Sequence, residues 1–254
     1  MNTLLLVDGS NMAMRAAFGG KMEPERAIQI ATGLIGRAIR QSQATHMVIC
    51  MDSDGPSFRS KLLPTYKANR TIDTAPFIKL AQETWMRAKW YVEECSGFEA
   101  DDLIVTIAHR ALSHFANVVV LSNDSDLLIL SNEGARILKP ENGGTFLFLT
   151  ESDICKKYNV ASSVLLTDLK AMTGEKGDNV PGVPGIGEKR ASDLISKYGN
   201  LGMVILAGSR EETCKYSKQV WECRQAATLA FEVLTLRKDV PLPPINPTNC
   251  RINP

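Results

Sequence analysis

Two short segments of the chain concentrate carboxylates beside apolar runs. Residues 97–102 read Gly-Phe-Glu-Ala-Asp-Asp, and residues 122–126 read Ser-Asn-Asp-Ser-Asp. Like charges this close repel one another, and several carboxylates stay ionised together only when a cation holds them. Asp and Glu oxygens with no neighbouring Cys or His suit Mg²⁺ or Mn²⁺ better than Zn²⁺. The two segments therefore predict a divalent-metal site.

The elements around these acids predict how they are brought together. Residues 3–7, 46–51 and 117–121 are short apolar runs typical of buried strands, and they lead into Asp8, Asp52 and Asp124. Residues 25–40 carry apolar side chains at helical spacing, and residues 103–112 continue a helix opened by residues 99–102. Strands that alternate with helices favour a mostly parallel sheet with helices on both faces. Ligands of such sheets bind beyond the carboxyl ends of the strands, where all three Asp residues are expected.

A turn or a helix cap explains any one of these three Asp residues, but it explains all three together poorly.

Further along, residues 77–95 are expected to be helical, and residues 135–138 and 145–149 to form a hairpin. From about residue 151 the pattern turns all-helical, with an amphipathic helix over residues 215–237. We expect three parts: an α/β core over 1–150, a helical region over 151–240 and an extended tail over 241–254.

Composition places the chain among ordinary globular proteins. It has 254 residues, 44% hydrophobic and 22% charged, with a net charge of +1. A near-neutral total excludes neither a nucleic acid nor an acidic ligand, because local fields decide. The six Cys form no C-x-x-C pair, the N-terminus lacks a basic region, and no apolar run is long enough to span a membrane. These features predict a cytoplasmic protein with reduced thiols and no membrane partner.

A glycine-rich segment follows in the helical region. Gly182, Gly185 and Gly187 predict a tight hairpin whose N–H groups point outward at a helix start, which is an anion site suited to phosphate. Lys189 and Arg190 add positive charge on the next turn. The spacing fits neither G-x-G-x-x-G nor a Walker sequence, so a nucleotide-binding fold is excluded.

Six segments, in order, resemble the 5′-nuclease family of flap endonucleases, phage 5′ exonucleases and the small domain of bacterial DNA polymerase I. They are residues 7–11 (Val-Asp-Gly-Ser-Asn), 51–59 (Met-Asp-Ser-Asp-Gly-Pro-Ser-Phe-Arg), 66–70 (Tyr-Lys-Ala-Asn-Arg), 97–102, 124–126 (Asp-Ser-Asp) and 177–187. The resemblance spans most of the chain, from Asp8 to about Tyr198. It implies a PIN-like α/β fold, followed by a DNA-binding helix–three-turn–helix region with its hairpin at about 172–198.

The resemblance also implies two Mg²⁺ ions, replaceable by Mn²⁺, in one acidic pocket where Asp8 and Asp101 are central to catalysis. The first ion would use Asp8, Asp52, Glu99 and Asp101, with Asp102 in the same cluster. The second would use Asp101, Asp124, Asp126 and Asp178. Glu175 stands where relatives usually have Asp, so it would reach an ion through water. Two such ions clamp the attacking and leaving oxygens of a phosphodiester displacement.

By the same resemblance, Lys67 and Arg70 are catalytic cations that stabilise charge on the scissile phosphate, with ordinary surface cations as the alternative. Tyr66 would stack on a base. Residues 71–96 occupy the position of the family's helical arch, and their shortness counts against a closed arch. The basic and aromatic side chains of residues 71–96 suit either a guide for single-stranded nucleic acid or a core helix whose cations extend to solvent. They are Lys79, Arg87, Lys89, Trp85, Trp90 and Tyr91.

The hairpin of relatives grips duplex backbone and holds a K⁺ ion through carbonyl oxygens. Here those carbonyls would belong to Met172, Thr173, Pro181, Val183 and Ile186. The phosphate contacts would come from Gly185, Ile186, Gly187, Lys189 and Arg190. Binding of this kind depends on shape and charge and is indifferent to sequence.

Together these expectations describe a metal-dependent 5′-3′ exonuclease or flap endonuclease. It would act on DNA with 5′ ends or flaps near duplex junctions during replication in a bacterial or phage-infected cell. We expect a free-standing enzyme, because no polymerase module follows, and we expect it to be a monomer. One alternative is RNase H-like removal of primers from RNA–DNA hybrids by the same site. Another is a junction-binding protein without catalysis, which would gain nothing from so much negative charge beside DNA.

Overall fold

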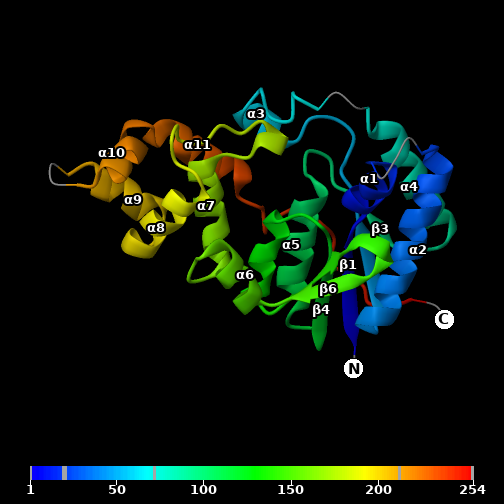
Figure 1. Ribbon diagram of the computed structural model, residues 1–254. Coiled ribbons are helices and arrows are strands. Elements are labelled where there is room, and N and C mark those ends of the chain that lie inside the picture. The colour runs from blue at the N-terminus through cyan, green and yellow to red at the C-terminus, as the bar shows by residue number, and fades with distance from the viewer. Residues whose placement is uncertain (1, 19–21, 71–72, 211–212, 253–254) are drawn as a thin grey trace. The chain divides into compact units, whose positions relative to one another are not determined.

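The computed structural model describes residues 2–18, 22–70, 73–210 and 213–252, and its chain divides into two units (Figure 1). Unit 1 comprises Met1–Ser57, Asp73–Thr150 and Leu236–Pro254, and unit 2 comprises Phe58–Ile72 and Glu151–Thr235. The expected boundary at residue 150 is present. However, residues 58–72 belong with the helical unit and the tail belongs with the sheet, so the expected three-part division is wrong in both places. No helix in the described ranges is long and apolar enough to cross a membrane.

Unit 1 is built on a six-stranded sheet with the order β3-β2-β1-β4-β5-β6. The strands are β1 (Thr3–Asp8), β2 (His46–Cys50), β3 (Val92–Glu93), β4 (Asn117–Leu121), β5 (Arg136–Pro140) and β6 (Phe146–Leu149). The first five run parallel, and β6 closes an antiparallel hairpin with β5, as expected. Val7 of the central strand lies opposite Ile49 and Leu121, so the carboxyl ends of β1, β2 and β4 meet at one edge.

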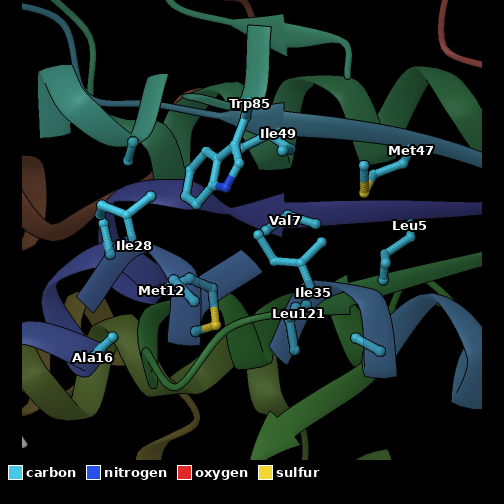
Figure 2. Packing of buried hydrophobic residues seen from close by; sticks show 14 of the residues in the cluster. Leu5, Val7, Met12, Ala16, Ile28, Ile35, Met47, Ile49, Trp85 and Leu121 are labelled. Carbon is cyan, nitrogen blue, oxygen red and sulfur yellow. The ribbon is translucent and has the colours of Figure 1, made fainter. Parts of the chain in front are cut away.

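Helices cover both faces of this sheet, which is why its central strands are apolar without alternation. They are α1 (Gly9–Phe18), α2 (Pro24–Ser42), α4 (Ala75–Arg87) and α5 (Ala100–Ala111). Figure 2 shows Trp85 of α4 and Ile35 of α2 packed beside Val7 and Leu121. Leu4 and Leu6 point to the opposite face, where α5 lies, and are also fully buried (Figure 1).

The arch position is only partly what the sequence led us to expect. The helix ends at Arg87, not Cys95, and the chain then enters β3. Trp85 is fully buried and its indole N–H donates to Thr32 Oγ1 at 2.9 Å, so the core alternative holds for this residue. The side chains of Lys79, Arg87 and Lys89 are exposed. Residues 71 and 72 of the expected arch lie outside the described residues.

Unit 2 is helical, as expected from residue 151 onward. Its helices are α3 (Phe58–Leu62), α6 (Glu151–Tyr158), α7 (Leu166–Thr173), α8 (Glu188–Tyr198), α9 (Leu201–Gly208), α10 (Lys215–Glu222) and α11 (Arg224–Leu234). One short 3₁₀ turn, η4 (Lys176–Asp178), lies between α7 and α8. The single helix expected over 215–237 is wrong, because the backbone at Cys223 (φ −98°, ψ 15°) separates α10 from α11.

The tail is fixed to unit 1 through its backbone. The Arg110 guanidinium donates to the carbonyls of Val240 and Leu242 at 3.0 and 3.1 Å. Met47 N donates to Cys250 O at 2.8 Å, which attaches the tail beside β2. All six cysteines are free thiols, in agreement with the sequence prediction.

Candidate active site

Asp8 ends the central strand and is held by two donors. It is 3% exposed, and its carboxylate accepts hydrogen bonds from Asn11 N at 2.9 Å and from the Ser122 hydroxyl at 2.7 Å. The Ser122 oxygen in turn accepts from Asp124 N at 2.9 Å. A single buried hydroxyl, 1% exposed, therefore ties Asp8 at the end of β1 to Asp124 beyond β4.

The residues after Asp8 bring α1 close to β2. A Cβ on Gly9 would lie 2.3 Å from Met51 Sδ and 2.6 Å from Ile49 Cγ2, so only glycine fits there. The next residue, Ser10, accepts a hydrogen bond from Asp52 N at 2.9 Å. This contact fixes the segment beyond β2 against the segment beyond β1.

The amino end of α5 brings three further acids to this edge. Asp52 Oδ1 accepts from Ala100 N at 2.8 Å, so Asp52 satisfies one of the free N–H groups that begin α5. Glu99 accepts from Ser57 Oγ at 2.9 Å and forms a reciprocal capping box with Asp102. Asp101 lies between them on the first turn.

Asp102, which the sequence predicted in the metal cluster, has two backbone partners. Its side chain has no exposed surface. One carboxylate oxygen accepts from Glu99 N at 3.3 Å and the other accepts from Arg237 N at 2.9 Å. Asp102 therefore caps α5 and anchors the start of the tail.

Burial and mutual repulsion disfavour ionisation of this acid cluster. Burial raises the pKa of Asp8 to about 7, against the hydrogen bonds from Ser122 and Asn11, and the charges of Asp124 and Asp52 add to the rise. Burial likewise raises the pKa of Asp101 well above its usual range, followed by the charges of Asp124, Asp8, Asp126 and Asp52. The acids beyond β1, β2 and β4 thus act on the same two buried carboxyl groups, Asp8 and Asp101.

The donor set fits a hydrated divalent cation. In the described part of the chain, no three His, Cys, Asp or Glu side chains are spaced to hold one metal ion directly. Mg²⁺ keeps several of its waters and binds proteins through one or two carboxylates, so it does not need a closed cage. A cation among all-oxygen donors would also relieve the repulsion that raises the pKa of Asp8 and Asp101.

The two acids expected from unit 2 are paired with cations of that unit. Glu175 forms an ion pair with Lys170 at 3.1 Å, and Asp178 forms one with Arg70 at 2.6 Å. Asp178 also accepts a hydrogen bond from the Tyr66 hydroxyl at 3.2 Å. Tyr66 is 8% exposed, so little of its ring is open for the stacking on a base that the sequence predicted.

The glycine-rich hairpin of unit 2 lies between α7 and α8. Two of the five carbonyls expected to bind K⁺ already accept backbone hydrogen bonds, Met172 O from Val183 N and Val183 O from Ile186 N. Each carbonyl keeps a second lone pair. The Ile186 side chain is buried, so only its backbone remains for a phosphate contact.

The charged turn after the hairpin differs between its two cations. Gly185 has φ +78°, a conformation that favours glycine, and its carbonyl accepts from Arg190 at 2.5 Å. The Arg190 guanidinium also lies over the Tyr216 ring, 4.6 Å from its centroid. Lys189 is exposed. Lys189 is thus the better placed of the two for an outward contact.

Sequence reasoning missed the hydroxyls that orient the acids. Ser10 was visible inside the Asp-Gly-Ser-Asn segment, and Ser122 immediately precedes Asn-Asp. Their partners are 42 and 114 positions away, so no local pattern could identify the contacts.

Comparisons with known proteins agree with this geometry. A family model described as "5′-3′ exonuclease, N-terminal resolvase-like domain" matches residues 3–159, and one described as "5′-3′ exonuclease, C-terminal SAM fold" matches residues 162–254. DNA polymerase I of Rhizobium leguminosarum is 30% identical over 259 residues, covering 94% of this chain and 25% of the polymerase. DNA polymerase I of Bacillus caldotenax is 30% identical over 250 residues, covering 94% and 28%. The chain thus spans about a quarter of the length of these relatives.

Solved structures share the fold. A zinc-bound T5 5′-exonuclease matches with a TM-score of 0.80 and 23% identity, over 92% of this chain and 90% of that one. A complex of the bacteriophage T5 flap endonuclease with DNA and metal ions matches with a TM-score of 0.79 and 22% identity, over 92% and 89%. These matches confirm the expected α/β fold with a helical C-terminal region. From both family models, which together match nearly the whole sequence, we conclude that the chain belongs to the 5′-3′ exonuclease family of nucleases.

Proposed function

We propose that this protein is a divalent-metal-dependent 5′-3′ exonuclease and flap endonuclease that hydrolyses DNA phosphodiesters near duplex junctions. One observation carries the proposal: Asp8, Asp52 and Asp124 lie at the carboxyl edge of a parallel sheet, where burial, and then the charges of Asp124 and Asp52, raise the pKa of Asp8 and Asp101. Clustered carboxylates of this kind bind a cation, and membership of the 5′-3′ exonuclease family indicates the reaction, which is hydrolysis of phosphodiesters.

The proposed cation is Mg²⁺, two ions in all, with Mn²⁺ as a substitute. The residues that would hold them are Asp8, Asp52, Glu99, Asp101, Asp124 and Asp126. Ions bound there supply positive charge for the phosphate and lower the pKa of water. The protein's own part is to orient the acids through Ser10, Ser57 and Ser122, so that they need little rearrangement.

The basic residues of unit 2 are proposed to handle the nucleic acid. Lys67 and Arg70 would stabilise negative charge on the scissile phosphate. The hairpin over residues 172–190 would hold duplex phosphates through Lys189 and backbone N–H groups, with K⁺ on its carbonyls. The proposed substrate is DNA with a 5′ end or flap, and RNA–DNA hybrids are tested beside it.

Cleavage of three 5′-labelled substrates tests the proposal: a flap, a blunt duplex and an RNA-primed duplex, each with Mg²⁺ or EDTA. We expect Mg²⁺-dependent products from the flap and none with EDTA. Asp126→Asn should abolish product while DNA binding, measured with Ca²⁺, is retained. Asp193→Asn, an exposed acid on α8, is the matched control and should cleave normally. Binding without cleavage by the wild type would support the junction-binding alternative, and preference for the RNA-primed duplex would support the RNase H-like one.

A further inference from the structure

A tight turn precedes α5, and the hydroxyl of Ser53, in the segment beyond β2, contacts it twice. Phe98 N donates to Cys95 O at 3.1 Å, and Gly97 between them has φ +84°, as glycine has at the third position of a type II turn. Ser53 Oγ accepts a hydrogen bond from Gly97 N at 3.2 Å and donates one to Phe98 O at 3.2 Å. One hydroxyl thus satisfies a donor and an acceptor of the same turn.

The two residues after the turn are held by the same segment beyond β2. Glu99 accepts from Ser57 Oγ at 2.9 Å, and Ala100 N donates to Asp52 Oδ1 at 2.8 Å. The segment beyond β2 therefore binds each of residues 97–100 in turn, and both segments belong to unit 1. The path of the chain into α5 follows the shape of that segment.

Ser53 differs from the other two contacts in the point at which it acts. Ser57 and Asp52 bind the acid and the first N–H of the helix, whereas Ser53 binds the turn that delivers both. Glycine adopts many backbone conformations at little cost, so a turn built on Gly97 needs outside contacts to keep one of them. A hydroxyl suits this task because it donates and accepts at once, which an alanine at position 53 could not do.

We infer that Ser53 is a positioning residue that places the Glu99 carboxylate at the edge of the sheet by fixing the turn before it. The inference rests on the proposed function, because it takes Glu99 as one of the acids that hold a divalent cation. Ser53 acts through Glu99 and needs no contact of its own with the cation or with DNA. A small displacement of the acid is enough to matter, since catalytic geometry tolerates little error.

Ser53→Ala tests the inference with two measurements that do not depend on cleavage. In the metal-free protein, amide hydrogen exchange at Gly97 should become about 5- to 10-fold faster, because its N–H loses its acceptor. Mn²⁺ binding without DNA, followed by electron paramagnetic resonance, should become about 3- to 10-fold weaker, the effect of one hydrogen bond. Single-turnover cleavage of a flap should need a correspondingly higher Mg²⁺ concentration. Ser53→Thr keeps the hydroxyl and should restore all three.

Two further variants separate positioning from a loss of folding. Ser113→Ala is the matched control, because its hydroxyl donates to Arg110 O near the opposite end of α5, and it should bind Mn²⁺ as the wild type does. Gly97→Ala alters the turn without touching Ser53. A methyl group has open space there, but the positive φ disfavours alanine, so Mn²⁺ binding should weaken as in Ser53→Ala. Thermal unfolding checks that each variant is folded, and Gly97→Ala decides the question if Ser53→Ala is not.

Unchanged Mn²⁺ binding by the folded Ser53→Ala protein would overturn the inference, whether or not exchange at Gly97 becomes faster, because the contact would then only stabilise the turn. Weaker binding that Ser53→Thr fails to restore would also overturn it. Failure of the wild type to bind Mn²⁺ or to cleave the flap would instead overturn the proposed function.

Discussion

Asp8 is a buried acid whose surroundings oppose its own ionisation. Burial raises its pKa to about 7 from the ordinary 3.8. A carboxyl group with a raised pKa favours the folded state below its unfolded pKa, and that advantage is lost as the pH rises through the folded pKa. Without a cation, Asp8 therefore lowers the stability progressively between its ordinary pKa of 3.8 and its folded pKa of about 7, and the full loss is present above that value.

Asp8→Asn should consequently stabilise the metal-free protein at pH 8. Each pKa unit corresponds to 1.36 kcal/mol, so the shift sets an upper limit of about 4 kcal/mol, and we expect about 1–3 kcal/mol because the buried amide keeps part of the cost. Urea unfolding in EDTA at pH 8 and pH 4 measures it. The gain should be small at pH 4, where the wild-type carboxyl is largely protonated when folded. An equal gain at both values would contradict the argument.

Ser122→Ala should reduce the free energy of metal binding by more than it reduces the free energy of unfolding. Its hydroxyl fixes Asp8 and the backbone of Asp124 together, so its loss frees both acids. We expect a higher Mg²⁺ requirement for cleavage and weaker Mn²⁺ binding, with Ser122→Thr restoring both. Ser42→Ala is the matched control, because this buried hydroxyl donates to Ala38 O away from the acids. Equal metal binding by Ser122→Ala and the wild type would count against the role.

At the scale of elements, the turn at the start of α8 gives Lys189 and Arg190 different surroundings, although the sequence predicted a phosphate contact for both. Both residues are exposed, but Arg190 donates to Gly185 O and lies over the Tyr216 ring. Lys189→Ala should flatten the slope of log affinity against log salt by about 0.9 for any duplex, as loss of one phosphate contact does. Anisotropy titrations measure the slope, with Lys156→Ala on α6 as the control. Coinciding slopes for Lys189→Ala and the wild type would remove this residue from the duplex contact.

The sequence predicted elements best where burial imposes a pattern. β1, β2 and β4 were predictable because both faces are covered and each strand contains an unbroken run of at least four apolar residues. β3 was not, since two residues carry no periodicity. The acids of the site were predictable because they lie in short local segments. The contact of Asp102 with the tail was not, because its partner, Arg237, lies 135 positions away.

At the scale of the whole molecule, Asp102 connects the sheet-edge helix to the returning tail. Asp102→Ala removes a buried carboxylate that caps α5 and accepts a hydrogen bond from Arg237 N. We expect a loss of about 2–4 kcal/mol in unfolding free energy, the sum of a cap and a buried hydrogen bond. Urea unfolding measures it, and limited proteolysis should then cut first near residues 236–242. Intact stability with weakened Mn²⁺ binding would instead return Asp102 to the metal ligands.

The two units are not consecutive pieces of the chain. Unit 2 takes Phe58–Ile72 from between two strands of the sheet, and unit 1 takes its last segment from after α11. A cut at residue 150 would therefore yield two fragments, neither of which is a unit. The C-terminal fragment would lack the Tyr66–Arg70 turn that η4 holds, and the N-terminal one would lack the segment that Asp102 anchors. Exchange of units between relatives must follow spatial borders, which lie at four places in the chain (57/58, 72/73, 150/151 and 235/236) instead of one.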